Sequence, residues 1–172
     1  MKKIIFTGPE CSGKTTLSRE IAKHFSLVWV EEYARQYLEK LQRPYKYSDL
    51  KKIAQGQLQL ENRTKKNQIL ICDTNLQVIK LWSLIKFSKC DPFIINNQDT
   101  KALYILCKPD FPWTFDHLRE NPQNREEIFN LYHQDLVENN MDFIVVKGNY
   151  NKRFQLIKTL IYQYVDSICL KK

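Results

Sequence analysis

The chain is poor in the residues that interrupt regular structure. Its 172 residues include only four glycines and six prolines, and no segment is of low complexity or repeats another. These absences exclude a repeat architecture and an extended linker. Hydrophobic residues make up 43% and charged residues 27%, which is the composition of an ordinary soluble globular protein. The length fits one domain with one core, which we expect to span residues 1–172.

Paired cysteines are also missing. The five cysteines are an odd number, none forms a C-x-x-C pair, and the three histidines lie apart from them. This pattern argues against a zinc site and against a disulfide framework. Free thiols are typical of a reducing compartment, so we expect a cytoplasmic protein. The cysteines are Cys11, Cys72, Cys90, Cys107 and Cys169.

Long apolar runs and clustered basic residues are absent as well. No apolar run approaches the length of a membrane span, and Met1 leads almost directly into the apolar residues 4–6, so we expect no signal peptide and no membrane partner. The net charge is +8, but no basic run exceeds three residues. We therefore favour a solvated surface that attracts a polyanionic small molecule over a nucleic-acid site.

Short apolar runs alternate with amphipathic segments along the chain. Continuous apolar residues favour parallel strands buried on both faces, and the alternation predicts an α/β domain. The expected strands are Lys2–Thr7, Leu27–Val30, Ile69–Thr74, Ala102–Cys107 and Phe143–Gly148. The expected helix stripes are Leu50, Ile53, Ala54 and Leu58; Ile128, Leu131, Tyr132 and Leu136; and Phe154, Ile157, Ile161, Val165 and Ile168. Ligands of such sheets bind outside the carboxyl ends of the strands.

A phosphate-binding motif follows the first strand. The segment GPECSGKT fits G-x-x-x-x-G-K-[ST] in full, and it precedes a helix expected from about Lys14 to Phe25. Its amides and the helix N-terminus favour polyphosphate, Lys14 should reach the β and γ phosphates, and Thr15 should bind Mg²⁺. ATP and Mg²⁺ are therefore the expected cofactors. The predicted nucleotide contacts are Gly8, Glu10, Cys11, Ser12, Gly13, Lys14, Thr15 and Thr16.

Acidic residues follow the second and third strands. Glu31 and Glu32 lie next to the expected phosphate site, or they form an acidic start to the next helix. Asp73 ends the strand ILIC at a position typical of a Mg²⁺-binding aspartate. It could also cap the helix that starts near Asn75, and the two interpretations are compatible.

Two further segments carry polar residues in unexpected places. Gln57 and Glu61 share a helix stripe with core residues, so either the core or a ligand must satisfy them. The segment KPDFPWTFDHLRENPQNREE contains three prolines and cannot form one helix. We expect a lid at about residues 110–126. Its Arg119 and Arg125 either neutralise a transferring phosphoryl group or are solvated surface residues.

These segments together resemble the ribosylnicotinamide kinase domain, which in bacteria is commonly the C-terminal part of NadR proteins. The resemblance rests on GPECSGKTT, EEYARQYL, YSDLKKIAQGQ, CDT, PDFPWTFDHLRENP and the late arginine of NKRF, and it covers nearly the whole chain in order. One departure is Cys11, where the family usually has serine. NadR proteins can also carry DNA-binding and adenylyltransferase domains, and we expect neither role here because the chain has no room for those domains.

The resemblance implies a P-loop kinase fold with a parallel sheet ordered 2-3-1-4-5. It implies transfer of the ATP γ-phosphate to the 5′-hydroxyl of nicotinamide riboside, which gives nicotinamide mononucleotide. Lys14, Glu32, Asp73, Arg119 and Arg125 match its catalytic positions. Its substrate-binding positions match Glu32, Tyr33, Arg35, Gln57, Asp73, Trp113 and Asp116, which moves Gln57 from a core role toward a ligand role.

Several roles stay open at the level of sequence. Glu32 is our candidate base, with Asp73 on Mg²⁺ or a substrate hydroxyl, but these roles could be exchanged. Tyr33, Trp82 and Trp113 could stack on the cationic ring of the riboside, although Trp82 could equally belong to the core. Cys11 is either a reactive thiol or an inert one. The acceptor could also be another nucleoside or an alcohol such as thiamine, or the chain could bind nucleotide without catalysis. The oligomeric state is not predicted.

Overall fold

A five-stranded parallel sheet forms the centre of the chain. The computed structural model describes residues 2–63 and 69–169, with side chains described up to residue 163. The strand order is β2-β3-β1-β4-β5, as the resemblance implied. The strands are β1 (Lys2–Thr7), β2 (Val28–Val30), β3 (Ile69–Asp73), β4 (Leu103–Cys107) and β5 (Asp142–Val146). Their bounds agree with the predicted ones to within two residues.

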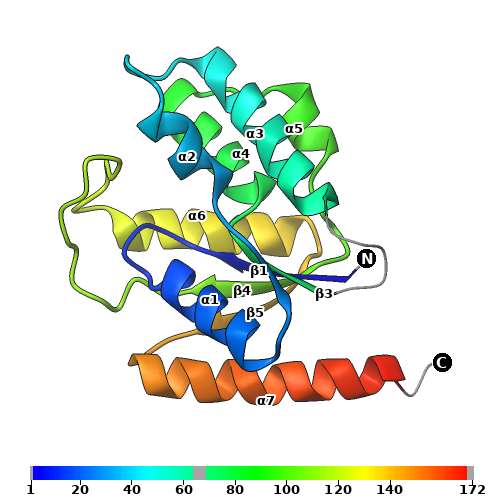
Figure 1. Cartoon of the computed structure of the whole chain (residues 1–172). Coiled ribbons are helices and arrows are strands. Elements are labelled where there is room, and N and C mark those ends of the chain that lie inside the picture. Colours follow the sequence, from blue (N-terminus) through cyan, green and yellow to red (C-terminus); the bar gives the residue numbers. More distant parts are fainter. Residues whose placement is uncertain (1, 64–68, 170–172) are drawn as a thin grey trace.

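Helices cover both faces of this sheet. Figure 1 shows α1 and α7 on one side and α6 on the other, with α2 to α5 gathered beyond the sheet. The helices are α1 (Lys14–His24), α2 (Tyr33–Glu39), α3 (Tyr47–Asn62), α4 (Leu76–Phe87), α5 (Pro92–Asn96), α6 (Arg125–Glu138) and α7 (Tyr150–Cys169). Within the described ranges, none of them combines the length and the apolarity that a bilayer span requires.

Successive residues of β1 pack against different layers, because side chains of a strand alternate between its two faces. Ile4 and Phe6 pack in a cluster with Leu17 of α1 and Ile157 of α7. Ile5 packs in the cluster that includes residues of α4 and α6. Because both faces of the central strands are buried, their apolar runs are continuous, as predicted. The edge strand β5 departs from this expectation, since Val145 is 36% exposed.

The predicted helix stripes are confirmed with one exception. Leu131 is 41% exposed, whereas Phe129 is 8% exposed and takes the place in the core that we assigned to Leu131. Leu131 lies on the outer side of α6, because the buried residues Ile128, Tyr132 and Leu136 define a face on which Phe129 lies instead. The predicted stripe positions Val165 and Ile168 lie outside the described side chains. The described thiols, Cys11, Cys72, Cys90 and Cys107, are all free.

Candidate active site

The phosphate-binding loop joins β1 to α1 and requires glycine at both of its ends. Gly8 has φ 125° and Gly13 has φ 83°, in a region that disfavours side chains. A Cβ on Gly8 would lie 2.6 Å from the carbonyl oxygen of Cys107, and one on Gly13 would lie 2.8 Å from Cε2 of Phe111. The loop therefore packs directly against the end of β4 and the segment that follows it.

The start of α1 is available to an anion. No side chain among the described residues caps this helix, and its first turn holds no acid. Lys14 donates from Nζ to the carbonyl oxygen of Pro9 at 2.6 Å, and the Ser12 hydroxyl donates to the same oxygen at 2.7 Å. These two bonds stabilise the conformation of the loop. The free amides at the start of α1 remain able to bind phosphate.

A cavity of about 760 Å³ opens in front of this loop. Its lining comes from the loop, from α2, from α4, from α6 and from the connection between β4 and α6. The predicted site residues that line it are Glu10, Cys11, Ser12, Gly13, Lys14, Thr15, Thr16, Glu32, Arg35 and Arg119. The structure thus brings most of the predicted nucleotide contacts together with the candidate base.

Glu32 is poised to accept a proton near neutral pH. It occupies the N-cap position of α2, yet its side chain makes no capping hydrogen bond. Burial, together with the negative charge of Asp73, raises the pKa of Glu32 to about 7, while Lys14 and Arg35 act in the opposite direction. A general base is most effective when its pKa lies near the working pH. Glu32 thus stands at the start of α2, as one of the two interpretations expected, but its side chain does not cap the helix.

Asp73 is a buried carboxylate with an oxygen that lacks a partner. It ends β3 and is 2% exposed, and among the described residues its Oδ1 accepts no hydrogen bond. Burial raises its pKa, and a hydrogen bond with the Thr15 side chain lowers it in part. Asn75 caps α4 instead, accepting the N–H of Gln77 at 3.0 Å, so Asp73 is not the helix cap. The residue between them, Thr74, has φ 70°, a strained value for a β-branched side chain.

The residues present fit a magnesium ion. A buried oxygen without a partner, next to the Thr15 hydroxyl, offers the hard oxygen ligands that Mg²⁺ prefers. Within the part of the chain that the structure describes, no three His, Cys, Asp or Glu residues group as a metal site. An ion held by one carboxylate and one hydroxyl would take nucleotide phosphates and water as its other ligands.

Comparison with known proteins places the chain in a family. Residues 3–153 match the AAA_28 family, described as an AAA domain. The chain belongs to this family. It is 30% identical over 165 residues to the trifunctional NAD biosynthesis/regulator protein NadR of Escherichia coli (strain K12), an alignment that covers 90% of this chain and 40% of that protein. The chain thus spans about two fifths of the length of this relative.

Solved structures extend the comparison to the fold of this AAA domain. A NadR protein in complex with NR has a TM-score of 0.75 and 22% identity, with 92% of this chain and 50% of that chain covered. A thymidylate kinase from Ehrlichia chaffeensis has a TM-score of 0.60 and 16% identity, with 92% and 98% covered. These similarities confirm the resemblance to NadR proteins and the fold of P-loop kinases.

Several predicted site residues of the AAA domain do not line the cavity, namely Gly8, Tyr33, Gln57, Asp73, Trp113, Asp116 and Arg125. Gln57 is 2% exposed, accepts the N–H of Tyr33 at 2.9 Å and donates to Glu61 at 3.3 Å. The ring of Tyr33 lies over Gly56, where a Cβ would be 2.0 Å from Cε1 of that ring. Arg125 donates to the carbonyl oxygen of Phe111 at 2.9 Å, at the base of the expected lid. Tyr33, Gln57 and Arg125 thus make contacts with neighbouring segments instead of lining the cavity.

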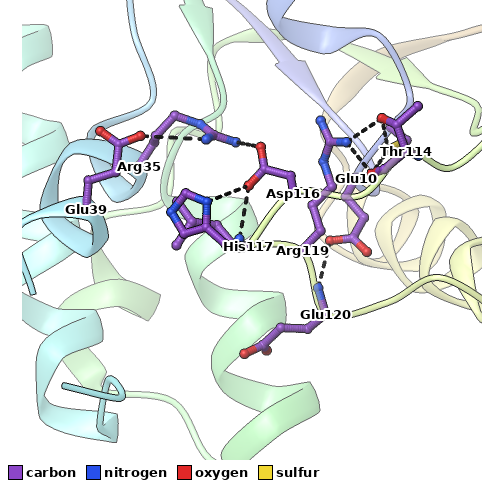
Figure 2. Close-up of polar contacts among 10 residues, drawn as sticks. Glu10, Arg35, Glu39, Thr114, Asp116, His117, Arg119 and Glu120 are labelled. Atoms are coloured by element: carbon purple, nitrogen blue, oxygen red, sulfur yellow. Dashed lines mark hydrogen bonds and ion pairs between the residues drawn. The ribbon is translucent and has the colours of Figure 1, made fainter. Parts of the chain in front are cut away.

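The expected lid contacts both sides of the cavity. Residues 108–124 form a connection without helix or strand, so the last two residues of the predicted lid already belong to α6. Figure 2 shows Asp116 paired with Arg35 of α2 and Arg119 turned toward Thr114. The distances are 2.9 Å for the first pair and 2.6 Å from Arg119 Nη1 to each of the two Thr114 oxygens. Of the two arginines predicted in the lid, Arg119 lines the cavity and Arg125 does not, so Arg119 fits the predicted catalytic role better.

Sequence reasoning missed the cavity position of Tyr132 and the role of Arg153. Tyr132 lines the cavity, although we placed it only in the core stripe of α6. Trp82 lines the cavity, packs against a core cluster and donates to the Tyr45 hydroxyl at 2.7 Å, and its stacking role stays a prediction. Arg153 is fully buried and donates to the carbonyl oxygens of Ser12, Lys108 and Gly148. A signal for it was present, because an arginine four residues before Ile157 lies on the apolar stripe of α7.

Proposed function

We propose that the chain is a kinase that transfers the γ-phosphate of ATP, with Mg²⁺, to the 5′-hydroxyl of nicotinamide riboside. The observation that carries this proposal is the presence of Glu32, with a pKa raised to about 7, in the same cavity as Lys14 and Thr15. The similarity to NadR, one of whose structures contains NR, supports the choice of acceptor.

The phosphate loop would hold the donor. Lys14 would exchange its bond with Pro9 for the β and γ phosphates, and the uncapped amides of α1 would bind the remaining oxygens. Thr15 and Asp73 would hold Mg²⁺, which neutralises charge on the phosphates when it is bound. These groups supply alignment and charge neutralisation, which is most of what phosphoryl transfer requires.

Glu32 would orient the acceptor hydroxyl and take its proton as the bond to phosphorus forms. Arg119, already on the cavity wall, would turn from Thr114 toward the transferring group. The segment 110–124 would act as a lid that keeps water away from the phosphate, since water competes with the hydroxyl as acceptor. The catalytic role predicted for Arg125 stays a prediction, and its bond to Phe111 supports a role at the lid base.

The cavity wall suits a ring with positive charge. Trp82 and Tyr132 offer aromatic faces, and Glu32 adds a carboxylate, whereas the carboxylate of Glu120 is paired with Lys86. A cation over an aromatic ring gains about 0.5–2 kcal/mol, depending on how far it is desolvated. Of the three predicted stacking partners, Trp82 lines the cavity and Tyr33 and Trp113 do not, so we assign this role to Trp82 and Tyr132. The proposal requires neither a nucleic acid nor a membrane.

An acceptor screen with purified protein, ATP and Mg²⁺ tests this function. We expect a higher kcat/KM for nicotinamide riboside than for adenosine, uridine, thymidine or thiamine, with products identified by mass spectrometry. Preference for a neutral nucleoside or for thiamine would overturn the acceptor and leave the kinase. Tight ATP binding without turnover on any acceptor would favour a nucleotide-dependent binding module.

A further inference from the structure

The carboxylate of Glu10 gathers donors from the expected lid. Its Oε1 accepts the backbone N–H of Asn121 at 2.6 Å and the indole N–H of Trp113 at 3.2 Å. Its Oε2 accepts the backbone N–H of Glu120 at 3.2 Å, the contact drawn in Figure 2. Trp113 and Asn121 flank the tip of the segment, so one side chain holds both of its arms against the phosphate-binding loop.

An acid at this position needs an explanation. Glu10 lies inside the loop between Gly8 and Gly13, where a bound polyphosphate would repel a free carboxylate. The three lid donors satisfy this charge with hydrogen bonds. Hydrogen bonds from backbone amides to a carboxylate are also stronger than those between neutral groups. The negative charge of Glu10, which would be unfavourable next to phosphate, therefore attaches the lid to the phosphate-binding loop.

Other lid contacts are weaker or lie elsewhere. Arg35 pairs with Asp116 at 2.9 Å, but its side chain is 41% exposed, and exposed ion pairs contribute little. The thiol of Cys11 accepts the N–H of Thr114 at 3.4 Å, a weak bond to sulfur. Arg153 joins the Ser12 carbonyl oxygen to the Asp110 carboxylate at the base of the lid, so Glu10 is the polar link between the phosphate loop and the outer part of the lid, residues 113–121.

We propose that Glu10 is a positioning residue that keeps the lid, residues 110–124, closed over the phosphate-binding loop. Its catalytic consequence rests on the proposed kinase function: with the lid held, water is excluded and ATP is used for transfer rather than hydrolysis. The attachment itself is a property of the chain without substrates, so it can be tested separately.

Hydrogen exchange in the free chain tests the attachment. In Glu10→Ala, the amides of Glu120 and Asn121 should exchange about 10–100-fold faster, because each loses a hydrogen bond to a charged acceptor. Glu10→Gln keeps an acceptor without the charge and should give an intermediate rate. Glu138→Ala is the control, since Glu138 is exposed and its hydrogen bond is to Gln134 of the same helix. Equal protection of the two amides in all variants would overturn the proposal.

The partition of ATP tests the consequence. The ratio of ATP hydrolysis without acceptor to phosphoryl transfer should rise at least about tenfold in Glu10→Ala and partly in Glu10→Gln, with no change in Glu138→Ala. An unchanged ratio, despite faster exchange, would overturn the role in excluding water. Faster exchange in a chain that transfers no phosphate at all would support the attachment and count against the proposed kinase function instead.

Discussion

The backbone N–H of Tyr33 donates to Oε1 of Gln57 at 2.9 Å, at the first residue of α2. A helix N-terminus needs acceptors for its free amides, and the residue at the N-cap, here Glu32, usually supplies one. Gln57 satisfies the amide of Tyr33 from the neighbouring helix α3, while Glu32 makes no capping bond and lines the cavity. A residue predicted to bind substrate therefore anchors the start of α2, next to the candidate base.

Gln57→Leu should lower the free energy of unfolding by about 1–3 kcal/mol, since it leaves a buried N–H without a partner. It should also lower kcat, because the start of α2, next to Glu32, would lose its hydrogen bond to α3. Denaturant unfolding and steady-state kinetics measure both effects. Gln59→Leu, at an exposed position of the same helix, is the control and should stay within about 0.5 kcal/mol of wild type. Equal stabilities of the two variants would contradict the role of Gln57.

The raised pKa of Glu32 makes stability depend on pH. The pKa is about 7 in the folded chain against 4.5 for an ordinary glutamate, so the folded state binds more protons between these values. Stability should therefore fall as pH rises through this window, by about 1–3 kcal/mol. Glu32→Gln has no proton to lose, so its advantage in melting temperature over wild type should grow from pH 4.5 to pH 8. A constant difference across this range would mean that the pKa of Glu32 is ordinary.

Asp73→Asn should weaken the response to magnesium. The substitution keeps an oxygen but removes the charge that attracts the ion, so half-maximal activity should need at least about tenfold more Mg²⁺. Stability should stay equal or rise, because a buried carboxylate oxygen without a partner is unfavourable. Asp142→Asn, at an exposed position, is the control. The same Mg²⁺ titration for wild type and Asp73→Asn would remove Asp73 from the metal site.

Alkylation of Cys11 should inactivate the chain. Its half-buried thiol contacts Thr114 of the lid, so a bulky adduct would push the lid from the loop and obstruct the phosphate site. Mg-ATP should protect against the reagent, and Cys11→Ser should be active and resistant. Cys90 is also half-buried, so the modified residue must be identified by mass spectrometry. Inactivation that proceeds equally in Cys11→Ser would assign the effect to another thiol.

The sheet and the phosphate loop could be predicted because their signals are local. The glycine spacing of the loop is a local sequence pattern, and so are the apolar runs of the buried strands. By contrast, the direction in which an individual side chain points depends on packing between segments that are far apart in the sequence. Gln57 and Trp113 both looked like ligand residues, yet one turned to Tyr33 and the other to Glu10.

Long-range polar contacts were the least predictable feature. Glu10 and Asn121 are 111 positions apart, and no spacing in the sequence links them. Arg153 reaches the carbonyl oxygen of Ser12 across 141 positions. Such contacts arise where the carboxyl ends of several strands meet, so the sequence predicted the place of the site better than its internal bonds.

The transfer of labelled phosphate tests the central claim most directly. Wild-type chain, Mg²⁺, nicotinamide riboside and ATP labelled with ¹⁸O in the γ-phosphate should give nicotinamide mononucleotide that carries the label. Glu32→Gln should bind ATP normally and form this product about 10²–10⁴-fold more slowly, as loss of a general base predicts. Label found only in inorganic phosphate, or product formed equally fast by Glu32→Gln, would contradict the account.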